Sequence, residues 1–152
     1  MTDIHEGGCL CGAVRYRVTG APVAAYVCHC NYCQRSSGTA FQMPVFFKHR
    51  QVEFSGEPMQ TFDYVSPTHG RTVTTQFCAR CGTRVGSRIT RAPGIQSLSA
   101  GSFDVRDQFS VNCHLFTETK VPWVRLPADT PCYEKHFITE EGEKVEPLAV
   151  TG

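Results

Sequence analysis

The chain has 152 residues, with 15 Lys and Arg against 14 Asp and Glu and a formal net charge of +1. This balance argues against a nucleic-acid partner, because phosphate binding needs clustered lysine and arginine. No apolar run approaches the ~20 residues that cross a bilayer, so no membrane partner is expected either. The first eight residues carry no signal-peptide core, and we expect a cytoplasmic protein.

The length favours a single domain over residues 1–152, and the sequence carries no signal for an oligomeric state. Nine cysteines are present. Disulfide scaffolds belong mainly to small secreted chains, whereas this chain is larger and has an odd cysteine count. The cysteines therefore indicate metal binding or redox chemistry.

Apolar residues alternate with polar ones along much of the chain, which is typical of β-strands. Strand-like runs are expected, in chain order, at residues 13–18, 24–28, 41–47, 52–55, 61–65, 71–77, 83–87, 95–100 and 111–116. Pro44 has no N–H for a ladder, which indicates an edge strand or a bulge. One short helical turn is expected to begin near Asn31, and Asn31 is its expected N-cap. Gly- and Pro-rich turns between many short strands predict a mostly β fold.

Seven of the nine cysteines fall in three tight groups, and two of these groups together suit a four-thiolate metal site. Cys78 and Cys81 form a C-x-x-C turn closed by Gly82, the pattern of a zinc knuckle. Such a turn needs two more thiolates, which Cys9 and Cys11 can supply. Zinc is the expected metal, with iron as the alternative for a four-cysteine site.

The remaining group holds Cys28, Cys30 and Cys33. Three protein ligands and an open fourth position are typical of a reactive zinc, whereas four ligands are typical of a structural one. Three thiolates around Zn²⁺ leave a net charge of −1, which suits a soft fourth ligand such as a substrate thiol. The trio therefore predicts carbon–sulfur bond chemistry. It also predicts a second zinc site, which a partly occupied ion would satisfy. A disulfide within the trio is the alternative, because open thiolates oxidise easily.

Several other residues are candidates near the trio. Arg35 is expected either to grip a substrate carboxylate or, with the polar residues 34–38, to hydrogen-bond the sulfurs. His114 is expected either to bind substrate or to make a structural hydrogen bond. His29 and His114 are the nearest candidates for a general base. Cys113 and Cys132 are expected to pack in the core or near the surface. Trp123 is expected to be a packing anchor, with a binding platform as the alternative.

These motifs resemble the glutathione-dependent formaldehyde-activating (GFA) family, also called the CENP-V domain family. The similarity covers about residues 7–135 and lies in GCLCG at residues 8–12, CHCNYCQRSSG at 28–38, FCARCGT at 77–83, AGSFD at 100–104, His114 and the Pro122-Trp123 pair. The resemblance implies a small folded-sheet domain of the β-tent, Mss4-like type with zinc knuckles. It also implies a structural zinc on Cys9, Cys11, Cys78 and Cys81.

The second zinc, on Cys28, Cys30 and Cys33, would be the reactive one in such a family member. The family's activity joins glutathione and formaldehyde to give S-hydroxymethylglutathione, which makes it a carbon–sulfur lyase acting in reverse. We therefore expect a zinc-dependent lyase with a small glutathione-like thiol as partner. Two alternatives remain open: a non-catalytic zinc module that binds another protein, and a thiol-based sensor.

Overall fold

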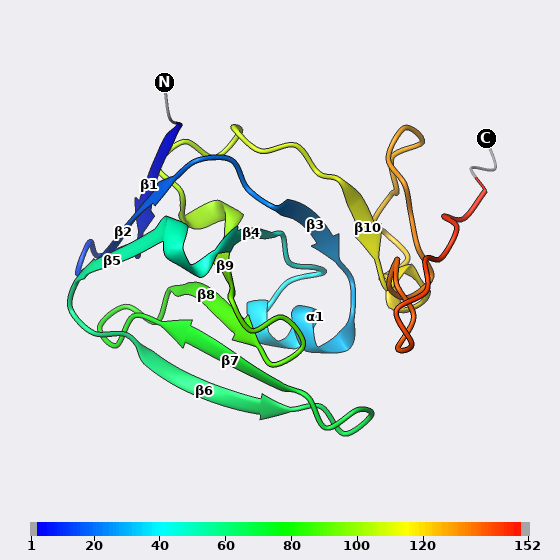
Figure 1. The fold of residues 1–152 in the computed structure, drawn as a ribbon, viewed down its shortest axis with the longest axis horizontal. Coiled ribbons are helices and arrows are strands. Elements are labelled where there is room, and N and C mark those ends of the chain that lie inside the picture. The colour runs from blue at the N-terminus through cyan, green and yellow to red at the C-terminus, as the bar shows by residue number, and fades with distance from the viewer. Residues whose placement is uncertain (1–2, 150–152) are drawn as a thin grey trace. The chain divides into compact units, whose positions relative to one another are not determined.

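The computed structural model describes residues 3–149 of the chain (Figure 1). These residues form two compact units, residues 3–24 with 44–109 and residues 25–43 with 110–149. Strands make up 39% of the structure and helices 11%, so the predicted mostly β class is confirmed. The single domain over residues 1–152 stays a prediction. Among the described residues, no helix has the length and apolarity that spanning a membrane requires.

The first unit contains a three-stranded antiparallel sheet in the order β1 (Ile4–Gly8), β2 (Val14–Thr19) and β5 (Val52–Gly56). Strand β2 is central, and its alternate residues Val14, Tyr16 and Val18 are buried while the residues between them are more exposed. This is the pattern of a sheet with one face on the core. Strand β1 is absent from the expected strands, because only Ile4 among its five residues is a strong β-former.

The same unit contains a run of five antiparallel strands, which ends in the long β6–β7–β8 meander of Figure 1. In order of pairing they are β4 (Pro44–Lys48), β9 (Ile95–Ser99), β8 (Arg84–Ile89), β7 (Thr72–Phe77) and β6 (Gln60–Val65). Pro44 opens β4, which is a position where a missing N–H costs little. Short 3-10 turns follow β4 (η1, His49–Gln51) and β9 (η2, Ala100–Ser102).

The core of this unit centres on Phe103, just after η2. Its ring lies 5.2 Å from that of Tyr16 on β2 and 6.1 Å from that of Phe47 on β4, measured between centroids. All three side chains are almost fully buried. Burying a ring of this size contributes roughly 1.5–3 kcal/mol, so Phe103 joins the two sheets of the unit by apolar contact.

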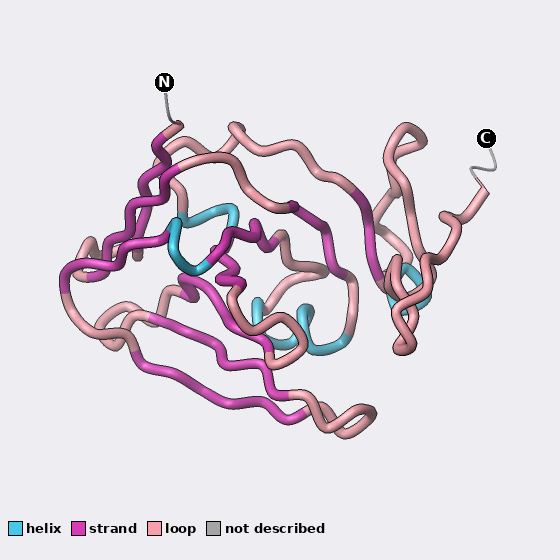
Figure 2. The backbone as a smooth tube through the Cα atoms, in the orientation of Figure 1, coloured by secondary structure: helices cyan, strands magenta, loops and turns pink. Residues whose placement is uncertain are grey.

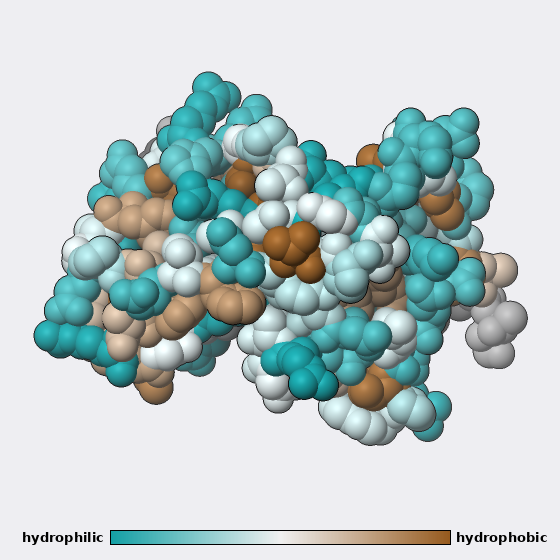
Figure 3. All heavy atoms as spheres, turned by 90° about the horizontal axis from the view of Figure 1, so that it is seen from below, coloured by the Kyte–Doolittle hydropathy of each residue, from teal (hydrophilic) through white to brown (hydrophobic). Residues whose placement is uncertain are grey.

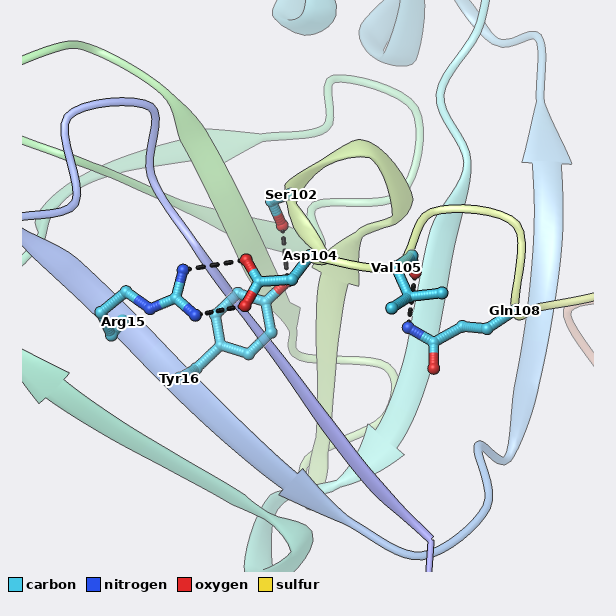
Figure 4. Close-up of polar contacts among 6 residues, drawn as sticks. All are labelled: Arg15, Tyr16, Ser102, Asp104, Val105 and Gln108. Carbon is cyan, nitrogen blue, oxygen red and sulfur yellow. Dashed lines mark hydrogen bonds and ion pairs between the residues drawn. The ribbon is translucent and has the colours of Figure 1, made fainter.

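Polar contacts reinforce the same junction (Figure 4). The Tyr16 hydroxyl lies 2.8 Å from Ser102 Oγ, and Arg15 pairs with Asp104 through both guanidinium nitrogens, at 3.0 and 2.5 Å. The hydrogen bond from Arg15 lowers the pKa of the Asp104 carboxyl. Both charged side chains are about half exposed, so this pair adds little to the stability of the fold. Its main effect is to hold the loop that follows η2 beside β2.

A close approach between β8 and β9 allows a buried glutamine to cross the sheet. Gln96 on β9 is fully buried, and its amide donates to Gln76 Oε1 at 2.6 Å and to the Ser97 carbonyl at 2.8 Å. The amide nitrogen passes over Gly86, where a Cβ would also collide with the Ser97 carbonyl oxygen. The absence of a side chain at Gly86 is therefore what admits the Gln96 amide.

The second unit pairs β3 (Ala24–Cys28) in parallel with β10 (Cys113–Leu115). It also holds helix α1 (Asn31–Ser37) and the 3-10 turn η3 (Thr117–Thr119). Beyond η3 the described chain is mostly loop (Figure 2). The short helix lies where the sequence predicts it, but its N-cap is Cys30 and not Asn31.

On the face drawn in Figure 3, moderately hydrophobic residues adjoin one another over the left half of the view. The strongly hydrophobic residues there lie in small separate patches with hydrophilic residues between them. Single exposed apolar side chains of this kind are ordinary on protein surfaces.

We predict that Gly86→Ala destabilises the first unit, because the new Cβ must displace the Ser97 carbonyl or the Gln96 amide. Overpacking of this kind costs about 1–3 kcal/mol of unfolding free energy. Urea denaturation of the metal-free protein measures the loss. Gly101→Ala is the matched control, because nothing lies within 4 Å of a Cβ at that position. Equal midpoints for the two variants would contradict the prediction.

Candidate metal centres

The first unit brings together Cys9, Cys11, Cys78 and Cys81, whose sulfur atoms all lie within 4.8 Å of one another. The Cys11 sulfur lies 3.6 Å from that of Cys9 and 3.8 Å from that of Cys78. A tetrahedral zinc with Zn–S bonds of ~2.3 Å holds its sulfurs ~3.8 Å apart. The spacing and the donor chemistry of this cluster therefore fit a four-thiolate ion.

Two tight turns present these cysteines, and each closes on a glycine. The Gly12 N–H donates to the Cys9 carbonyl at 3.1 Å, and the Gly82 N–H donates to the Cys78 carbonyl at 2.9 Å. Both glycines have positive φ, 80° and 71°, a conformation that side chains disfavour. The C-x-C and C-x-x-C-G patterns thus fold as the sequence indicates.

Thr83 ties the two turns together. Its hydroxyl oxygen accepts the Leu10 N–H at 3.1 Å and lies 3.1 Å from the Cys81 sulfur. That hydroxyl contact, with backbone hydrogen bonds, lowers the pKa of the Cys81 thiol to about 5. Cys81 is therefore a thiolate at neutral pH, the form that binds a metal.

The second unit brings together Cys28, Cys30 and Cys33, again with all three sulfurs within 4.8 Å of one another. Cys28 ends β3, Cys30 is the N-cap of α1, and Cys33 lies in the first helical turn. Within residues 3–149, no fourth His, Cys, Asp or Glu joins this group. The arrangement suits a soft metal ion with one coordination position left for another molecule.

The helix start and the cluster depend on the same sulfur atom. The Cys33 N–H donates to Cys30 Sγ at 3.3 Å, which satisfies one of the N–H groups that a helix leaves free at its first turn. At the other end, Gly38 adopts a left-handed conformation and its N–H returns to the Gln34 carbonyl. These two caps hold a seven-residue helix that would be marginal by itself.

Within the trio, hydrogen bonding favours the ionised form of one thiol over that of the other two. Hydrogen bonds from the Cys28 and Cys33 thiols lower the pKa of Cys30 to about 3. The contact with the Cys30 thiolate in turn raises the pKa of Cys28 to about 12, and contacts with Cys28 and Cys30 raise that of Cys33. Metal binding to all three sulfurs therefore releases protons, because a thiol binds a metal as the thiolate.

Between two of the trio lies His29, which is fully buried. Its Nε2 lies 3.0 Å from Nδ1 of His114, and the two rings stack at an interplanar angle of 21°. Phe41 packs against the other side at 5.6 Å between ring centroids. Burial lowers the pKa of His29 to about 4 and lowers that of His114. Both rings are therefore neutral at physiological pH.

The remaining sequence candidates have different positions. Arg35 is exposed on α1. The hydroxyl of Ser36 donates to the Tyr32 carbonyl, and that of Ser37 donates to the Phe41 carbonyl. The expected hydrogen bonds from residues 34–38 to the sulfurs stay a prediction.

Trp123 is 73% exposed, so its predicted packing role is wrong. Lys120 donates to the carbonyls of Val121 and Val124 and so closes the turn that carries the indole.

Cys113 is buried, as expected, and Cys132 is half-buried. The roles of Arg35 and His114 in binding substrate stay predictions.

The sequence analysis does not predict Thr119 as part of this site, and it predicts a different contact for Gln34. The side-chain amide of Gln34 and the hydroxyl of Thr119 both donate to the His29 carbonyl, at 2.7 and 2.9 Å. Thr119 is 90 residues from His29 along the chain, and no motif spacing signals the contact. Only the pairing of β10 with β3 brings it there.

Together these features define a small, mostly β protein with two cysteine clusters that could hold metal ions. A solved structure shares the fold: a Rhodobacter sphaeroides protein at 19% identity and a TM-score of 0.54, with 70% of this chain and 96% of that chain covered.

The family model described as glutathione-dependent formaldehyde-activating enzyme matches residues 4–119. The chain belongs to this family, and the resemblance seen in the sequence is confirmed. The matched residues include both cysteine clusters and also His114 and Thr119.

We predict that thiol reactivity depends on pH differently at two half-buried cysteines of the metal-free protein. The pKa of Cys81 is lowered to about 5, so its thiolate fraction and alkylation rate should be nearly constant from pH 6.5 to 8. Burial raises the pKa of Cys132, so its rate should rise about tenfold per pH unit. Timed iodoacetamide labelling followed by peptide mass spectrometry measures both rates. Parallel pH profiles would contradict the prediction.

Proposed function

We propose that the protein is a zinc-dependent carbon–sulfur lyase-type enzyme that joins a thiol to an aldehyde, with glutathione and formaldehyde as substrates. Membership of the formaldehyde-activating family supports this reaction. The observation that carries it is the trio Cys28, Cys30 and Cys33, whose sulfurs converge within 4.8 Å and form a group of only three ligands among the described residues.

Zinc bound by the trio would supply a cation that accepts the substrate sulfur as a thiolate. The chain's own part is to keep three thiols converged and to hold the backbone that carries them. Arg35, exposed on α1 two residues after Cys33, is the proposed partner for a glutathione carboxylate, which an arginine can bind through two parallel hydrogen bonds.

The proposed reaction needs no oxidant or reductant. The sulfur of the thiol forms a bond to the carbon of formaldehyde, and the C=O double bond becomes a single bond. The proton lost by the thiol ends on the new hydroxyl oxygen of S-hydroxymethylglutathione. The reverse direction breaks the same carbon–sulfur bond and returns the proton to sulfur.

The other cluster has a different proposed role. Cys9, Cys11, Cys78 and Cys81 form a complete set of four thiols, which suits a structural zinc. Such an ion would hold the turn after β1 against the turn between β7 and β8. All nine cysteines are free thiols, and the cytoplasm is the compartment in which such thiols stay reduced.

The first test is the metal content. The wild-type protein should bind two zinc ions per chain, and Cys30→Ser should bind one, because it removes a ligand from the trio and leaves the four-cysteine cluster intact. Cys132→Ser is the matched control and should keep two ions. Inductively coupled plasma mass spectrometry gives the ratio. One ion in both wild type and Cys30→Ser would favour a non-catalytic zinc module.

The second test is the reaction itself. Mixing glutathione with formaldehyde should consume free thiol faster when the two-zinc protein is present, and Cys30→Ser should reduce that acceleration to the background rate. Thiol titration or NMR of the new methylene group follows the reaction. Arg35→Ala should raise KM for glutathione with little change in kcat. If no small thiol reacts faster with the two-zinc protein than without it, the lyase assignment is wrong.

A further inference from the structure

The peptide units on both sides of His29 are held by one segment of the chain. The His29 N–H donates to the Leu115 carbonyl at 3.0 Å, and the His29 carbonyl accepts the Thr119 hydroxyl at 2.9 Å. These two peptide units are the links from Cys28 to His29 and from His29 to Cys30. Holding both planes restricts the backbone positions from which the sulfurs of Cys28 and Cys30 project.

The helix that carries Cys33 is attached to the same segment. The Gln34 side-chain amide donates one hydrogen to the His29 carbonyl at 2.7 Å and the other to the Thr119 carbonyl at 2.9 Å. A single side chain therefore joins α1, the turn between Cys28 and Cys30, and η3. All three sulfurs are positioned through this connection.

The ring of His29 is held as well. Its Nε2 and Nδ1 of His114 share one hydrogen bond of 3.0 Å inside the unit, and Phe41 lies against the ring. Both histidines are buried, so the bond is protected from competition with water. The position of the His29 ring is therefore restricted from this side too.

The segment reverses direction through a strained residue. Phe116 has φ 57° and ψ 44°, the left-handed region that bulky side chains avoid. This turn lets Leu115 bind one side of His29 while Thr119, four residues on, binds the other. Strain of this kind persists only where surrounding contacts over-determine the backbone, and it often accompanies a site.

We propose that residues 114–119 form a clamp that sets the geometry of the three-cysteine site, with Thr119 and His114 as positioning residues. The clamp touches no sulfur directly and acts through the backbone of His29 and the side chain of Gln34. This inference rests on the metal site of the proposed function but not on the identity of the thiol or the aldehyde.

Thr119→Val is the main test, because valine keeps the shape and removes the hydroxyl. Contacts that orient metal ligands are typically worth 10–100-fold in affinity, so we expect the trio to bind its ion about tenfold more weakly. Titration with Co²⁺ reports this without an activity assay, since the sulfur-to-cobalt charge-transfer and d–d bands show ligand number and geometry. Competition with a chelator gives both dissociation constants.

Three comparisons separate positioning from general loss of stability. Thr117 lies in the same turn, η3, as Thr119, and its hydroxyl donates to the Tyr133 carbonyl at 3.1 Å. The Thr117→Val variant removes that hydroxyl and should bind both ions like wild type. Thr119→Ser keeps the hydroxyl and should restore affinity. In every variant the four-cysteine cluster serves as an internal reference, and its Co²⁺ spectrum should not change.

His114→Phe should weaken the same site in the same direction as Thr119→Val. If it leaves both Co²⁺ constants unchanged and only raises KM for the thiol, His114 binds substrate and its part in the clamp is wrong. Equal constants for Thr119→Val and Thr117→Val would overturn the clamp while the two-ion stoichiometry, and hence the proposed function, stands. A wild-type chain that binds a single ion would overturn both.

Discussion

The crowding of sulfur atoms is the constraint on which the rest of the structure depends. Thiolates within 4.8 Å of one another repel, because like charges at such distances disfavour the ionised form. In the trio, hydrogen bonds from Cys28 and Cys33 lower the pKa of Cys30 to about 3, and the contact with Cys30 raises the pKa of Cys28 to about 12. A divalent cation at the centre removes the conflict by replacing the shared protons. Both clusters are therefore groups of converged thiols that could hold a metal ion.

The two clusters meet this constraint differently. The four-cysteine cluster is presented by two glycine-closed turns tied through Thr83, and it offers a complete tetrahedron. The trio is built on a strand end and a helix start, and the clamp that we propose for it supplies no ligand. A closed site can be specified by its own turns, whereas an open one needs support from elsewhere to keep its geometry when the fourth position changes occupant.

The sequence predicts the cysteine groups and most strands because both are local patterns. C-x-C and C-x-x-C-G spacings define turns, and period-two alternation defines strands such as β2 and β7. The sequence does not predict strand β1, because its residues are poor β-formers and its pairing with β2 decides the structure. The sequence favours Asn31 as the N-cap of α1, whereas the structure has Cys30, because a cysteine sulfur is an unusual cap. The contacts of Thr119 and the exposure of Trp123 both depend on the tertiary arrangement. The spacing of residues in the sequence does not encode that arrangement.

The distance along the chain between the two halves of the four-cysteine cluster has its own consequence. Cys11 and Cys78 are separated by 67 positions, so an ion bound to both closes a long loop. A covalent link across such a loop removes about 4 kcal/mol of entropic freedom from the unfolded chain on the polymer estimate. A bound ion would therefore stabilise the fold largely by restricting its denatured ensemble, and a chelator would release that restriction even where native contacts stay the same.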